Sequence, residues 1–247
     1  MQSVLLVLVG GALLRLSLSG AYQDYVKPGL GPYLTLSGAI LAGLGVWGAV
    51  RAGFGPAEPA GEVDPADSGD EVEHGDAHGS GHDHPGARTA WLLLLPVLTI
   101  FVIAPPPLGA FAADRSVSSI PPPADSAAAL PVLPKPDPVD IGVVDYALRA
   151  VWDDGKTLAG RTVRMVGFVT AAPGGGWYLT KMQISCCAAD AQPFRIRTVG
   201  APPFAPDTWV QVVGSWVPGG GTQRDDAIPN VKVDSAVRVP RPANPYE

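Results

Sequence analysis

An uncharged stretch of 21 residues, Leu30 to Val50, constrains the fold of this chain more than any other feature. A helix of that length is about 31 Å long, which matches the hydrocarbon core of a bilayer. Lys27 and Arg51 flank the stretch, which therefore predicts a membrane-spanning helix. Its small residues predict a face that another helix can approach closely; they are Gly38, Ala39, Ala42, Gly43, Gly45 and Gly48.

Two further stretches are long and apolar enough to span a bilayer, Val4 to Ala21 and Ala90 to Ala113. The first ends in small residues, as a signal peptide does, but it lacks a basic n-region, which favours a retained helix. Arg15 is expected to reach the membrane interface, with a charge that faces a partner helix as the alternative. The sequence thus predicts three transmembrane helices, at about 4–21, 30–50 and 90–113.

Composition agrees with a membrane protein that has a soluble part. Hydrophobic residues make up 47% of the chain and charged residues only 16%, too apolar a balance for an ordinary soluble domain. The net charge of −6 comes mainly from residues 51–88, which carry nine acids and two arginines. Residues 114–247 carry thirteen charges of each sign, so the soluble part is neutral.

The acidic loop 51–88 is rich in Gly, Pro, Asp and Glu and is predicted to be disordered. It contains all four histidines of the chain: His74, His78, His82 and His84. Imidazoles interleaved with carboxylates can bind zinc, nickel or copper. Glycines at 75, 79 and 81 oppose a helix, so we expect a weak metal site, and a plain acidic linker is the alternative.

A Pro-rich spacer, 114–139, leads to a predicted domain at 140–247. Asp140 is expected to cap a short helix, Ile141 to Trp152. Five strands then follow at short spacing; they are 161–170, 177–184, 194–199, 209–217 and 231–239. A glycine recurs within two of the long strands, at Gly167 and Gly214, where a small barrel has to bend. The predicted fold class is a membrane α region followed by an all-β domain, a partly open five-stranded barrel of the OB type.

Nucleic acid is excluded as a partner, because binding phosphates requires a basic surface and this domain is neutral. Its tryptophans and tyrosines are therefore expected in the core or at sheet edges. The sequence contains no catalytic constellation, and we do not predict an enzyme.

The only two cysteines, Cys186 and Cys187, are adjacent, and they follow the predicted strand 177–184. Thiolates are soft ligands for zinc, Cu(I) or a metalloid, and they are also redox nucleophiles. No second cysteine pair or downstream histidine would complete a closed structural zinc site, and there is no C-x-x-C motif. Three interpretations of the cysteines remain open: a ligand pair for a soft metal, a redox pair, or ordinary thiols of which one is buried in the core.

The segment Cys186-Cys187-Ala188-Ala189-Asp190-Ala191 resembles the Cys-Cys-Ala-x-Asp-Ala motif of the YcgQ-like family of three-helix permease subunits. Similar residues surround it and recur in the N-terminal half; they are Ser19-Gly20, Tyr25-Val26, Pro28, Pro105 to Gly109, Gly167 to Val169 and Trp209 to Gly214. The resemblance spans nearly the whole chain. It implies association with a multi-helix permease of the YraQ-like type, whose substrate in some relatives is a metal or metalloid species, and it gives weight to Asp190 beside the two cysteines.

The leading function hypothesis is therefore an accessory subunit of a permease complex, whose outer domain presents two thiols to a soft metal ion, zinc, a metalloid or a partner. Three helices with few polar groups do not make a transport pathway by themselves. A membrane-anchored thiol-redox protein and an envelope structural or interaction protein are the alternatives. Flanking charges do not decide the orientation. The Pro-rich spacer favours a multi-pass protein of the cell membrane with an extracytoplasmic C-terminal domain.

Overall fold

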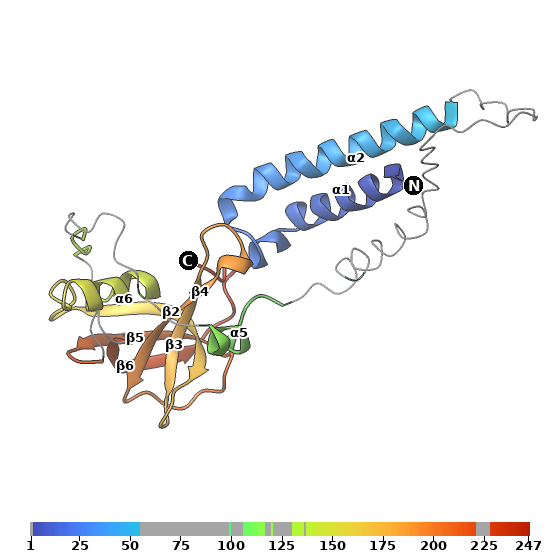
Figure 1. Ribbon diagram of the computed structural model, residues 1–247. Helices are drawn as coiled ribbons and strands as arrows, with labels where there is room; N and C mark the ends of the chain where they lie inside the picture. Colours follow the sequence, from blue (N-terminus) through green and yellow to red (C-terminus); the bar gives the residue numbers. More distant parts are fainter. Residues whose placement is uncertain are drawn as a thin grey trace, which may run out of the picture. The chain divides into compact units, whose positions relative to one another are not determined.

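The computed structural model describes residues 2–54, 99, 106–116, 120, 130–135, 137–220 and 228–247. The chain divides into two compact units (Figure 1). The first consists of Met1–Leu18 and Tyr33–Pro105, and the second of Ser19–Pro32 and Pro106–Glu247. The four predicted histidine ligands lie outside the described residues.

The first unit contains the helix α1 (Gln2–Leu18) and, from Tyr33 on, the helix α2 (Gly31–Phe54). Within the described residues, Pro28–Arg51 is the one helical stretch long and apolar enough to cross a membrane, a property that a signal sequence near an N-terminus can share. At 17 residues, α1 is shorter, about 25 Å. The predicted first span ran to Ala21, but the helix ends at Leu18, since Gly20 adopts a left-handed φ of 75° before a short 3-10 turn, η1 (Ala21–Asp24).

Glycines allow the backbones of α1 and α2 to touch. A Cβ on Gly10 would lie 2.5 Å from the backbone nitrogen of Ala42 and 2.7 Å from the carbonyl oxygen of Gly38. A Cβ on Gly45 would lie 2.8 Å from the carbonyl oxygen of Ser3. Gly38, Ala42, Gly45 and Gly48 of the predicted small face therefore lie against the preceding helix, whereas Gly43 has open space and Ala39 is exposed.

The second unit contains a five-stranded mixed barrel, as the sequence predicted. Its strands are β2 (Thr162–Ala171), β3 (Trp177–Gln183), β4 (Gln192–Val199), β5 (Trp209–Val217) and β6 (Asn230–Arg238). They run in the order β2-β3-β4-β6-β5, and pairing of β2 with β5 closes the ring, so the barrel is more complete than the partly open form expected. Only the pairing of β4 with β6 is parallel within the ring, while a two-residue strand, β1 (Val139–Asp140), runs parallel to β2 outside it.

The barrel core is built from alternate strand residues such as Met165, Leu179, Ile196 and Val212. Helix α6 (Val143–Trp152) packs its apolar face onto this core. Gly214 is required where β5 crosses β6, because a Cβ there would lie 2.2 Å from the carbonyl oxygen of Lys232, at a shift in strand register. The glycine that the sequence singled out in this strand thus lies at a close backbone approach and a register shift.

The expected cap of α6 is wrong. Gly142 occupies the N-cap position, and the carboxylate of Glu247 accepts hydrogen bonds from the backbone N–H groups of Val143 (3.1 Å) and Val144 (3.0 Å). Asp140 instead forms an exposed ion pair with Arg164 at 3.0 Å. The cap comes from the far end of the sequence, where no local pattern reveals it.

Residues before 140 also belong to the second unit. The short helix α5 (Ala110–Arg115) carries Ala110 and Ala113, which the sequence placed at the end of the third span 90–113. Both alanines pack in a second apolar cluster with Phe168, Met182, Ile184 and Tyr246. The rest of that predicted span, apart from Thr99, lies outside the described residues.

Candidate metal centre

The two cysteines lie in the turn that joins β3 to β4, at the strand end where the sequence placed them. The hairpin closes with the pair Gln183 and Gln192, and Ile184 anchors the loop by burying its side chain and donating its N–H to the carbonyl of Glu247 (3.0 Å). After the cysteines, a single 3-10 turn, η4 (Ala188–Asp190), carries the chain into β4. The thiols therefore sit on a short loop between two barrel strands.

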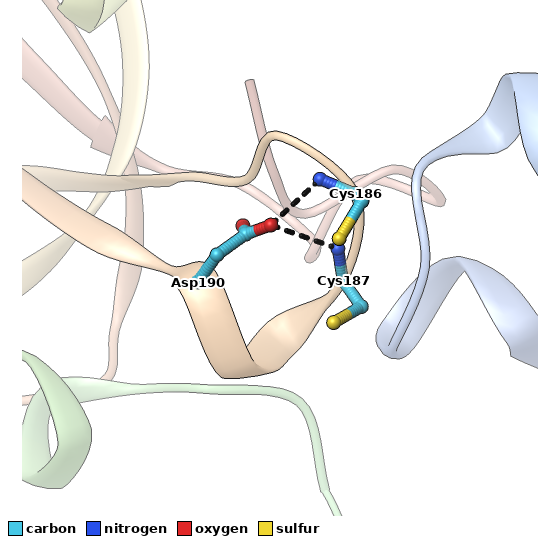
Figure 2. Close-up of side chains that lie close together, drawn as sticks. All are labelled: Cys186, Cys187 and Asp190. Carbon is cyan, nitrogen blue, oxygen red and sulfur yellow. Dashed lines mark hydrogen bonds between the residues drawn. The ribbon is translucent and has the colours of Figure 1, made fainter.

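Asp190 fixes the conformation of this loop (Figure 2). One carboxylate oxygen accepts the N–H of Ser185 at 2.8 Å, and the other accepts those of Cys186 at 2.8 Å and Cys187 at 3.4 Å. Three consecutive N–H groups that converge on one anion form a backbone nest. The carboxylate thus satisfies three donors that would otherwise rely on solvent, and holds both cysteines in place.

This arrangement brings the three candidate ligands together, as Figure 2 shows for Cys186, Cys187 and Asp190. Their ligand atoms all lie within 4.8 Å of one another. Two thiolates on one zinc-sized ion, at about 2.3 Å each, can be at most about 4.6 Å apart. One ion can therefore contact all three groups after small side-chain rotations. Cys186 is exposed and Cys187 half-buried, so solvent or a partner can supply further ligands.

The charge of Asp190 controls the protonation of Cys186. A hydrogen bond from the thiol to this carboxylate, followed by a hydrogen bond with Cys187, raises the pKa of Cys186 from 9.0 to about 11. The same thiol bond, with the N–H groups of Ser185 and Cys186, lowers the pKa of Asp190 from 3.8 to about 2. At neutral pH the site is a thiol beside a carboxylate, and a metal ion that binds Cys186 must displace its proton.

A segment from the N-terminal half completes the surroundings of the loop, and sequence reasoning missed it. Val26 forms an antiparallel bridge with Cys187, the N–H of Lys27 donates to the carbonyl of Cys186 (3.1 Å), and the N–H of Ala188 donates to the carbonyl of Tyr25 (2.7 Å). All of these residues belong to the second unit. No periodicity or spacing predicts a pairing between residues so far apart in sequence.

Lys181, which precedes the pair in β3, is not part of the cluster of ligand atoms. Its side chain is buried, and its ammonium group lies 5.0 Å from the centre of the Trp209 ring. Desolvation lowers its pKa, and the nearby charge of Glu247 opposes that shift. We therefore interpret the role of Lys181 as structural: its buried ammonium group packs against the ring of Trp209.

Comparison with known proteins gives one match. Residues 146–247 match the family model described as the DUF1980 C-terminal domain. The matched range covers the barrel and the thiol loop, but it starts inside α6 and includes neither β1 nor the segment that contains Val26. No curated protein and no solved structure matches the chain.

Proposed function

We propose that the barrel domain binds a soft metal ion or metalloid through Cys186, Cys187 and Asp190, as the exposed module of a membrane-bound permease complex. The observation that carries the proposal is the convergence of two sulfur atoms and one carboxylate within 4.8 Å on a loop whose backbone is already fixed. A preformed ligand set avoids much of the ordering cost that a flexible one incurs.

The ligand set favours thiophilic ions. Two thiolates and one carboxylate leave a tetrahedral ion with an open position, which differs from the four-ligand sets of structural zinc sites. An open position on an exposed loop suits an ion that is received and handed on. Within this proposal the ion is cargo rather than a permanent component of the fold.

A redox function is less well supported by the same site. Thiol exchange proceeds through the thiolate, and the attacking thiol works best with a pKa near the ambient pH. The bond to Asp190 raises the pKa of Cys186 to about 11, so its thiol is almost fully protonated at neutral pH. A metal ion can displace that proton as it binds, whereas thiol exchange at Cys186 would be slow at this small thiolate fraction.

The membrane setting and the partner extend the proposal. The apolar helix Pro28–Arg51 supports an anchor in the cell membrane, and the resemblance to YcgQ-like subunits supports a YraQ-like permease as the partner. The proposed topology is multi-pass with the barrel outside the cytoplasm. The strand order and the parallel pairing of β4 with β6 support an OB-type barrel.

Titration of the full-length protein in detergent with Cd²⁺ tests the site. The thiolate–cadmium absorption band should saturate near one equivalent, and it should vanish in the Cys186→Ser/Cys187→Ser variant, because hydroxyls are poor ligands for soft ions. Ser185→Ala, which keeps the backbone N–H in the same loop, is the matched control and should bind as the unaltered protein does. Equal cadmium binding by the double serine variant would overturn the proposal.

Co-purification tests the partner separately. A tagged chain expressed beside a YraQ-like permease should retain the permease through detergent extraction. Recovery of the tagged chain alone under conditions that preserve other membrane complexes would remove the permease from the proposal, and it would leave the metal site unaffected.

A further inference from the structure

The segment Ser19–Pro32, here called the inter-helix segment because it joins α1 to α2, contacts the thiol loop on both sides of Cys187. Its Lys27 N–H binds the carbonyl of Cys186, and its Tyr25 carbonyl accepts the N–H of Ala188. Between these two bonds, Val26 bridges Cys187. The backbone of both cysteines is thus held by Asp190 from within the loop and by the inter-helix segment from outside it.

The inter-helix segment has a second attachment that involves no cysteine. Arg241 contacts both carboxylate oxygens of Asp24, at 2.8 and 3.4 Å. The hydroxyl of Tyr246 donates to the backbone carbonyl of Asp24 at 2.8 Å and accepts the N–H of Leu108 at 3.0 Å. Tyr246 is buried in the second apolar cluster, so this attachment belongs to the body of the domain. A change at Arg241 can therefore loosen the inter-helix segment without altering a candidate ligand.

We infer that docking of the inter-helix segment and metal binding by the thiol pair are coupled, so that each strengthens the other. The inference rests on the proposed metal site. A bound ion adds a second restraint on Cys186 and Cys187 to the one that Asp190 supplies, and these are the residues whose backbone the segment pairs with. The coupling is reciprocal: if docking raises the affinity for the metal by a given factor, the bound metal raises the equilibrium constant for docking by the same factor.

Because of its position in the chain, the segment can transmit the metal occupancy of the thiols to the helices. The segment is covalently continuous with α1 on one side and α2 on the other, so a change in its docking acts directly on the connection between those helices. A partner that contacts the helices can thereby respond to whether the thiols carry an ion. Few residues are needed, because the signal passes through the two backbone hydrogen bonds that form the bridge between Val26 and Cys187.

Hydrogen exchange of the full-length protein in detergent, with Cd²⁺ as the probe, tests the coupling. Saturating Cd²⁺ should slow exchange at the Lys27 and Ala188 amides, and Arg241→Ala should weaken Cd²⁺ binding by roughly fivefold or more, the lower end of typical coupling between sites. The charge swap Asp24→Arg/Arg241→Asp should restore the affinity. Arg238→Ala is the matched control, since this arginine is exposed at the end of β6 and the contacts to Asp24 come from Arg241.

The outcomes separate the two proposals. If Cd²⁺ binds in a cysteine-dependent way but Arg241→Ala binds equally well and exchange at Lys27 and Ala188 does not change, the coupling is overturned and the metal site stands. If the double serine variant still binds Cd²⁺, the metal site fails and the coupling fails with it. Exchange at core amides of β2 and β5 shows that Arg241→Ala has kept the fold, so a loss of affinity in a folded variant supports the inference.

Discussion

Cys186 donates to the carboxylate of Asp190 twice, through its backbone N–H over 2.8 Å and through its thiol. One side chain therefore sets both the geometry and the protonation state of the exposed cysteine. The two effects have opposite consequences for a ligand, because the first preorganises the sulfur and the second keeps a proton on it. Substitution of Asp190 separates them.

Asp190→Asn should lower the pKa of Cys186 from about 11 toward its usual 9.0, since the thiol loses a charged acceptor. Cadmium affinity should fall by at least about 10-fold, because the site loses a carboxylate ligand together with the group that orients both cysteines, and loss of an orienting group alone costs about 10- to 100-fold. The pH dependence of thiolate absorbance and a Cd²⁺ titration measure the two effects. An unchanged pKa of Cys186 would contradict the described thiol–carboxylate bond.

Metal binding should strengthen as pH rises. Cys186 is protonated at neutral pH and must lose that proton on binding, so cadmium affinity should rise about tenfold per unit between about pH 6 and 8 for each thiol proton released. Titrations at several pH values, with buffers that do not bind cadmium, measure the slope. A flat profile would mean that the sulfur of Cys186 is not a ligand.

The loop itself should be stable over a wide pH range. The pKa of Asp190 falls on folding, so its contribution is complete above pH 3.8 and is lost as pH drops through about 2. The pKa of Cys186 rises, so its contribution is complete below pH 9.0 and is lost as pH climbs through about 11. Carbon chemical shifts of both side chains should stay constant between these limits, and a transition near neutral pH would show that the carboxylate is not held as described.

Packing of the helix pair gives a test with adjacent residues. Gly10→Ala should destabilise the pair, because the new methyl would meet backbone atoms of α2 at 2.5 and 2.7 Å, whereas Gly11→Ala has nothing within 4 Å. Overpacking of this kind costs on the order of 1–3 kcal/mol. In thermal unfolding in detergent, the midpoint temperature of Gly10→Ala should therefore be well below that of Gly11→Ala. Equal midpoints would contradict the close contact of Gly10 with α2.

Two variants compare Glu247, the observed cap of α6, with Asp140, the cap that the sequence suggested. Glu247→Ala should cost about 1 kcal/mol, since two N–H groups at the helix start lose their acceptor. Asp140→Ala removes only an exposed ion pair, which contributes roughly 0–1 kcal/mol. Denaturant unfolding of the two variants compares them, and a larger loss for Asp140→Ala would restore the original assignment.

The sequence predicted those parts of the fold that are determined by residues close to one another in the chain. Alternating apolar residues bounded by Pro and Gly placed all five barrel strands within about two residues of their observed ends, the accuracy that such boundaries allow. The adjacent cysteines and the turn to Asp190 were also visible, because the whole loop lies within six residues. The end of α1 was overestimated, since hydropathy continues past Gly20 although the helix does not.

The parts that sequence missed depend on contacts between distant residues. Glu247 caps a helix that begins about a hundred residues earlier, and Val26 pairs with Cys187 across roughly 160 residues. Such contacts leave no periodic signal, because neither partner needs a special neighbour in its own segment. Asp190 was weighted as a ligand, but its role as acceptor for three N–H groups emerged only from the folded loop.

The pairing of Val26 with Cys187 also sets an order of events during synthesis. At about 5–20 residues per second, the ribosome reaches Cys187 roughly 8–30 s after it has made Val26. Throughout that interval the inter-helix segment has no thiol loop to join, and α2 is completed within the early part of it. The surroundings of the cysteines are therefore assembled from two segments made at well separated times, and a chain whose first two helices are misplaced would lack the two backbone bonds that Tyr25 and Lys27 supply to the thiol loop.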